Sequence, residues 1–189
     1  MRLVRLFGTT AVVVTDTTLL TGDALGDDRS RRLLARLALA APGPVPLARL
    51  ERDLGRPTLL RRDAATLAHA LGAPGLVVEQ DDGWMLRPGW ARVDVQVAHA
   101  LFARAVTAPP TTTLALVLRA LRSCCTATLL ASEDDAAPWV LEARTRHDRL
   151  LRDALVRAAA AARVLHDEEL ADDLLARALT PAPAHRRAG

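Results

Sequence analysis

The sequence predicts an α+β domain over residues 1–92, an all-α domain over residues 93–180 and a flexible tail over residues 181–189. Three observations support this division. Short runs of β-branched and apolar residues, separated by turn residues, lie before Gly89. After Gly89, apolar residues recur at helical spacing. Half of the 189 residues are hydrophobic, so a buried core is expected.

The N-terminal segment, from Leu3 onward, contains the runs "LVRLFG", "TAVVVT" and "TTLLTG". Gly8 and Asp16 stand between these runs, and both residue types favour turns. The runs are rich in Val, Thr and Leu, which suit a half-buried strand. The segment therefore predicts a small antiparallel sheet of three strands.

Three helices are predicted next. The first lies in "DDRSRRLLARLALAAPG", where Asp27 or Asp28 can cap the start and Pro42 ends the helix. The second lies in "VPLARLERDLG", with Gly55 at its C-cap. The third lies in "RRDAATLAHALG", residues 61–72. Its apolar positions recur every three or four residues and are expected to pack on the domain: Leu60, Ala64, Leu67 and Leu71.

The segment "GLVVEQDDGWMLRPG" predicts a β-hairpin that turns through Asp81, Asp82 and Gly83. An antiparallel sheet, three helices and a hairpin, in this order, are typical of a winged helix-turn-helix domain with an added N-terminal sheet. This is the fold predicted for residues 1–92.

Two helix pairs are predicted for the rest of the chain. "VDVQVAHALFARAVTAP" and "PTTTLALVLRALRSC" form the first pair around Pro109 and Pro110. After the acidic loop "ASEDDAAP", a long helix begins near Trp139, and a shorter helix contains Leu170 and Leu174. Small residues at every fourth position allow helices to approach closely, as in tetratricopeptide-like arrays of about 34 residues per pair.

Several of these segments resemble the antibiotic-regulatory (SARP-type) transcriptional activators, which join a response-regulator-type winged helix to a helical bacterial transcriptional activator domain. "DDRSRRLLARLAL" resembles the family's first helix, with Arg29 and Arg31 at its basic positions, and "DDGWMLRP" is similar to the wing strand, with Trp84 at the usual aromatic position. "VDVQVAHALFARAV" and "APWVLEARTRHDRLLRDALVRAAAAARVL" resemble the start and the long central helix of the activator domain. The third helix departs from the family, since Thr66 and His69 stand where basic residues are usual.

The outward side of the third helix is the predicted DNA-reading surface. It is expected to present Arg62, Ala65, Thr66 and His69, with Arg61 in the first turn. Arginine matches guanine edges and phosphate, and Thr and His side chains can hydrogen-bond to bases or phosphate. The alternative is that these side chains form an ordinary solvated face.

Further DNA contacts are predicted from the first helix and the hairpin. Arg29, Arg31 and Arg32 are expected to contact phosphates, or alternatively to form a solubilising cluster beside the two aspartates that precede them. Arg87, on the second strand of the hairpin, is expected to approach the minor groove. The aspartates of the hairpin turn work against this contact, because they repel phosphate.

The formal net charge is +3, and all 25 basic residues are arginine. Residues 1–93 carry 13 arginines against 10 acidic residues, whereas residues 94–189 carry 12 against 12. A mild preference for polyanions is therefore predicted for the first half alone.

No catalytic site, metal site or cofactor is predicted, so the chain is not expected to be an enzyme. His147 and Asp148 are sequence neighbours that point in different directions on a helix, and no flanked nucleophile accompanies them. "HDEE", from His166, is interpreted as a helix start. Cys124 and Cys125 are interpreted as small apolar groups, with a redox-sensing pair as the alternative. Without lysine the chain has no GxxxxGK phosphate loop.

The opening residues "MRLVRLFG" lack the apolar core of a signal peptide, and arginines interrupt every long apolar run, so a cytoplasmic protein without a membrane contact is expected. The leading hypothesis is a DNA-binding transcription regulator that engages promoter DNA as a homodimer or tandem pair. Its helical half would mediate self-association or contact RNA polymerase. The alternative is a protein-interaction module of the same architecture that has lost sequence-specific DNA binding.

Overall fold

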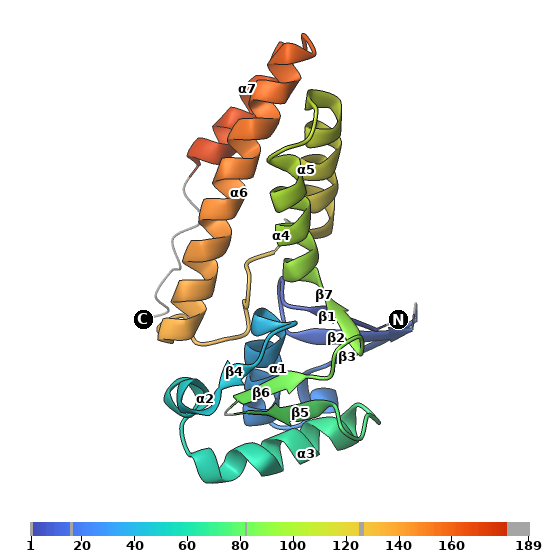
Figure 1. Ribbon diagram of the computed structural model, residues 1–189, viewed down its shortest axis with the longest axis vertical. Helices are drawn as coiled ribbons and strands as arrows, with labels where there is room; N and C mark the ends of the chain where they lie inside the picture. Colours follow the sequence, from blue (N-terminus) through green and yellow to red (C-terminus); the bar gives the residue numbers. More distant parts are fainter. Residues whose placement is uncertain (1, 16, 82, 125–126, 181–189) are drawn as a thin grey trace. The chain divides into compact units, whose positions relative to one another are not determined.

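The computed structural model describes residues 2–15, 17–81, 83–124 and 127–180 (Figure 1). The chain divides into two compact units, and each is described by itself. Unit 1 comprises residues 1–96 together with 127–139, and unit 2 comprises residues 97–126 together with 140–189. The fold is α+β, with a small N-terminal sheet followed by a helical region, as the sequence predicts.

Unit 1 begins with a four-stranded sheet in the order β3-β2-β1-β7. Its strands are β1 (Arg2–Arg5), β2 (Ala11–Thr15), β3 (Thr18–Thr21) and β7 (Ala91–Val93). The three antiparallel strands predicted from the sequence are confirmed. The fourth strand was not predicted: β7 pairs parallel to β1, with Val4 opposite Val93. Both valines are buried, so this pairing extends the core of the sheet.

The three predicted helices of unit 1 are present. They are α1 (Asp28–Ala40), α2 (Leu47–Leu54) and α3 (Leu60–Ala70). Asp27 caps α1, since its side chain accepts a hydrogen bond from the Ser30 backbone N–H at 2.8 Å. Leucines from all three helices are fully buried in the shared core, among them Leu33, Leu34, Leu37, Leu50, Leu60 and Leu67.

A second sheet has the order β4-β6-β5 and contains the predicted hairpin. Its strands are β4 (Val45–Pro46), β5 (Val77–Gln80) and β6 (Gly83–Leu86). Gly83 is required where β6 meets β4, because a Cβ atom there would lie 2.7 Å from the Val45 carbonyl oxygen. Trp84 and Met85 are buried, so the hairpin is anchored to the unit by its second strand.

Residues 127–139 belong to unit 1, whereas the sequence places them in the all-α domain. The reason is backbone pairing with the segment after β1. The Gly8 N–H donates to the Thr128 carbonyl at 2.8 Å, and the Leu130 N–H donates to the Leu6 carbonyl at 2.7 Å. Nearby, the buried Asp94 carboxylate accepts the backbone N–H of Leu6 at 3.0 Å. Burial raises the pKa of Asp94, although the backbone N–H groups that donate to its carboxylate oppose the rise.

The helical region contains α4 (Asp94–Ala105), α5 (Pro110–Cys124), α6 (Pro138–Val164) and α7 (Glu168–Leu179). The break between α4 and α5 falls at the predicted prolines, and the Thr113 hydroxyl donates to the Ala105 carbonyl across it at 3.1 Å. Buried alanines such as Ala158 and Ala162 allow close packing on α6. Asp167 caps α7 through the Leu170 N–H, which confirms the helix start predicted at "HDEE".

No helix in the described ranges is both long and apolar enough to cross a membrane. Cys125 and the predicted tail lie outside the described residues, and of Cys124 only the backbone, at the end of α5, is described.

Candidate nucleic-acid interface

The third helix, α3, has one buried and one exposed side, as its spacing predicts. Leu60 and Leu67 are at most 1% exposed. Arg61, Arg62 and His69 are exposed on the other side, together with Ala65. The ring of His69 has no hydrogen-bond or ion-pair partner among the described residues, so it is available to a ligand.

Thr66 is less available than predicted, because it is half-buried and lies against the turn before α1. A Cβ atom on Gly26 would lie 3.0 Å from the Thr66 methyl carbon, so Gly26 provides the space that this side chain fills. Gly26 has a φ of 95°, which also favours glycine.

Arg29 is held inside the protein by contacts that compete with its predicted role as a phosphate contact. Its Nε donates to Asp63 at 3.0 Å, and Asp63 is 1% exposed. Its Nη1 donates to the Leu54 carbonyl at 2.9 Å, and its Nη2 donates to the Gly55 carbonyl at 3.2 Å. Arg29 thus ties α1 to α3 and to the α2–α3 connection, and its remaining capacity for phosphate is small.

Arg31 and Arg32 lie in a mixed-charge cluster at the start of α1. Arg31 donates to the Gly26 carbonyl at 2.9 Å and pairs with Asp28 at 3.4 Å. Arg32 pairs with Asp28 at 3.1 Å and with the buried Glu133 at 3.5 Å. The pairs with Asp28 favour the alternative that the sequence left open, a solubilising cluster beside the aspartates at the start of this helix.

Arg61 and Arg62 are exposed but also paired. Arg61 lies 2.9 Å from Glu79 of β5, and Arg62 lies 3.4 Å from Asp27. The pKa of Asp27 is lowered, first by the Ser30 hydroxyl and backbone N–H and then by Arg62. Exposed pairs of this kind contribute only about 0–1 kcal/mol, so a phosphate can replace the carboxylate at little cost.

Arg87 lies just after β6, at the end of the strand away from the hairpin turn. Its Nη1 donates weakly to the Pro74 carbonyl at 3.4 Å. The turn itself carries the exposed Asp81. The hairpin therefore presents acid at its tip and Arg87 at its base, which is unfavourable for the predicted minor-groove contact.

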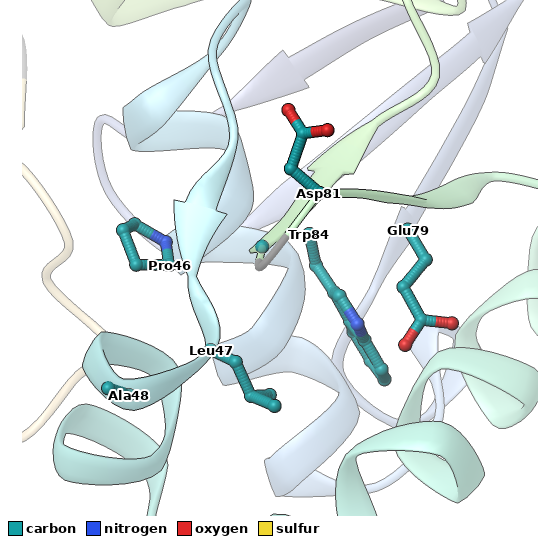
Figure 2. Close-up of a pocket in the computed structure, with 7 residues that line it drawn as sticks. Pro46, Leu47, Ala48, Glu79, Asp81 and Trp84 are labelled. Carbon is teal, nitrogen blue, oxygen red and sulfur yellow. The ribbon is translucent and has the colours of Figure 1, made fainter.

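A shallow hollow of about 260 Å³ lies beside the hairpin (Figure 2). Its apolar walls come from the start of α2 and from Trp84, and Figure 2 shows Glu79 and Asp81 on the hairpin side. The full lining is Pro46, Leu47, Ala48, Glu79, Asp81, Gly83 and Trp84. It has room for a small apolar group, and the two carboxylates would repel an anion.

Sequence reasoning missed the buried ion pairs of unit 1. Besides Arg29 with Asp63, Arg36 of α1 lies 2.7 Å from Asp53 of α2, and both side chains are over nine-tenths buried. A signal was present: Asp63 falls between the apolar positions Leu60 and Leu67, where an unpaired carboxylate would be costly.

Among the described residues, no three His, Cys, Asp or Glu side chains come together as a metal site. Comparisons with protein-family models, with curated proteins and with solved structures gave no match.

Proposed function

We propose that unit 1 is a winged helix-turn-helix domain that binds promoter DNA and that α3 is its recognition helix. The order of the elements supports this proposal: a small sheet, three helices and a hairpin that is joined by β4 into a three-stranded sheet. The observation that carries it is the exposed side of α3, where Arg61, Arg62 and His69 project opposite a fully buried side.

The chemistry of this side suits a DNA groove. Arg61 and Arg62 can form paired hydrogen bonds with phosphate or with guanine, His69 can donate to an acceptor, and the Ala65 methyl group can contact thymine. The carboxylates of Asp27 and Glu79 would be exchanged for phosphate on binding. Since only two arginines serve the groove, the expected affinity is low and its dependence on salt is shallow, because each phosphate contact contributes only about 0.9 to the slope of log affinity against log salt.

Under this proposal the helical region is tetratricopeptide-like and mediates self-association or contacts RNA polymerase, as the resemblance to SARP-type activators implies. The packing of small residues along α6 and α7 supports such an array. A homodimer or tandem pair would double the number of α3 contacts with DNA. The proposed role also implies a cytoplasmic location.

The test is binding of the full chain to DNA fragments from around its own gene, at low and moderate salt. We expect retarded fragments at low salt. The double variant R61A/R62A should reduce the slope of log affinity against log salt by up to about 1.8, or about 0.9 for each lost phosphate contact. A matched variant with two exposed arginines of unit 2 replaced, R104A/R177A, should still bind the specific fragment. Absence of any retarded fragment at either salt would rule out the proposal.

A second candidate function is a protein-interaction module without DNA recognition. It is favoured by the carboxylate partners of Arg29, Arg31, Arg32, Arg61 and Arg62 and by the acidic side of the hollow near Trp84. A pull-down would separate the two functions, because protein partners that persist after nuclease treatment support the module, whereas partners that vanish support DNA binding.

A further inference from the structure

The long helix α6 carries four exposed arginines within a short stretch: Arg146, Arg149, Arg152 and Arg157. None of them has an ion-pair or hydrogen-bond partner among the described residues. Arg163, further along the helix, differs because it pairs with Glu168 at 3.6 Å and with Asp172 at 3.3 Å. The four unpaired side chains are named here the α6 arginine surface.

Helical geometry places these arginines on one side of α6. With 3.6 residues per turn, Arg146, Arg149 and Arg157 lie within about 80° around the axis, and Arg152 lies about 60° beyond Arg149. From Arg146 to Arg157 the surface extends about 16 Å along the axis. The other side of this stretch is buried, with His147, Ala154, Leu155 and Ala158 in the core of unit 2.

One exposed carboxylate lies within the surface, because Asp153 is four residues from both Arg149 and Arg157. Between Arg146 and Arg157, a stretch that the structure describes in full, Asp153 is exposed and Asp148 is half-buried with a partner of its own. Asp153 forms no ion pair with the described arginines of the surface, so their guanidinium groups are solvated and can take an anionic ligand.

We propose that the α6 arginine surface binds the phosphate backbone of duplex DNA without reading its sequence. Arginine suits this ligand because its planar fork can donate two hydrogen bonds to one phosphate group. The exposed stretch holds no aromatic side chain that would stack on unpaired bases, which disfavours a single strand. Val156 is its one exposed large apolar residue, whereas the centre of a protein interface is usually apolar and poor in charge.

This contact is separate from the one proposed for α3, since it lies in unit 2 and needs no promoter sequence. Failure of either proposal is therefore visible on its own. The test uses random-sequence duplexes, whereas the α3 proposal is tested on specific fragments.

The experiment measures binding of the full chain to a fluorescent random duplex of about 30 base pairs at several salt concentrations. We expect R146A/R149A/R157A to lower affinity at least tenfold and to reduce the salt slope by about two to three. The matched control is R104A/R122A/R177A, which removes three exposed, unpaired arginines from α4, α5 and α7. The control should change the slope by less than one.

Two additional arms keep the test decisive. The charge-conserving variant R146K/R149K/R157K should retain most of the affinity, and it replaces the alanine variant if that variant does not fold. Poly-glutamate, as a competitor at equal charge concentration, should displace the duplex poorly. The proposal is overturned if the alanine and control variants behave alike, if wild type does not bind the random duplex, or if poly-glutamate binds more tightly than DNA.

Discussion

The exposed arginines of α3 and those of α6 differ in their surroundings. Arg61 and Arg62 each lie within 3.4 Å of a carboxylate from another element of unit 1. Arg146, Arg149, Arg152 and Arg157 have no such partner among the described residues. Residues 1–93 carry the larger net charge. Even so, the arginines of α3, the helix expected to bind DNA, are paired with carboxylates, whereas those of the α6 arginine surface are not.

The distribution of acidic residues explains this difference. In residues 94–189 most of the acidic side chains lie in the segment 133–135 and around the start of α7, at residues 167–173. In unit 1 acidic residues lie close to arginines at the starts of α1 and α3, and Glu79 of β5 lies beside Arg61. Net charge over half a chain is therefore a poor guide to which arginines can take a phosphate.

The largest expected effect concerns the pairing within unit 1. Replacing Asp63 by Ala leaves the half-buried Arg29 guanidinium without its carboxylate, and we expect a loss of about 2 kcal/mol in the free energy of unfolding. Urea unfolding followed by circular dichroism measures this loss. Asp23→Ala is the control, since Asp23 is fully exposed and pairs with Arg31 at 3.5 Å, and it should leave stability unchanged. Equal stabilities of the two variants would show that the Arg29 pair is not structural.

Acid should loosen α6 from α4. The His99 Nε2 and the His147 Nδ1 are 3.2 Å apart, and burial lowers the pKa of both rings to about 4, with nearby charges from His147 and Arg146 also acting on His99. The unfolded value is 6.5. The neutral rings therefore stabilise the fold fully above pH 6.5, and this stability is lost as the pH falls from 6.5 towards 4, by on the order of 2 kcal/mol for His147 at pH 5.

Urea midpoints measured between pH 7 and pH 5 test this expectation. His147→Leu should flatten the pH dependence, because it removes the more deeply buried ring of the pair. His166→Gln changes an exposed histidine and should keep the wild-type slope. A wild-type midpoint that does not fall with acid would contradict the buried neutral pair.

Removing the carboxylates that pair with α3 should sharpen the comparison. The variant D27N/E79Q frees Arg62 and Arg61, while asparagine at position 27 can still cap α1. If α3 binds DNA, affinity for a duplex should rise by about three- to tenfold at low salt. D167N/E169Q, which removes the same charge around the start of α7, should raise it much less. If the gain in affinity does not exceed that of this control, α3 does not contact the DNA backbone.

The smallest expected effect is on the α6 arginine surface. Asp153→Asn removes the exposed carboxylate within it, and affinity for a random duplex should increase by about two- to threefold without a change in stability. Asp173→Asn, an exposed aspartate of α7, is the matched change. Equal affinities for the two variants would place the bound DNA away from Asp153.

The helices and the hairpin could be predicted because their signals are local. Asp27 caps α1 through Ser30, three residues away, and the spacing of Leu60 and Leu67 determines which side of α3 is buried. These patterns repeat within one or two turns of the chain, so a single sequence is sufficient to detect them.

The partners of Arg29, Arg61 and Arg62 could not be found in the same way, whereas Asp28, the partner of Arg31 and Arg32, is only three and four residues away from them. Arg29 meets Asp63 across 34 positions, Arg62 meets Asp27 across 35, and Arg61 meets Glu79 across 18. The parallel pairing of β1 with β7 and the return of residues 127–139 to unit 1 also depend on contacts between distant segments.

By itself the sequence determined where helices and the hairpin form and which sides of them are apolar, because these properties follow from spacing and capping along the chain. Only the tertiary structure decided which arginines are neutralised and which remain free. A carboxylate neutralises an arginine through distance in space, and folding sets that distance independently of separation along the chain.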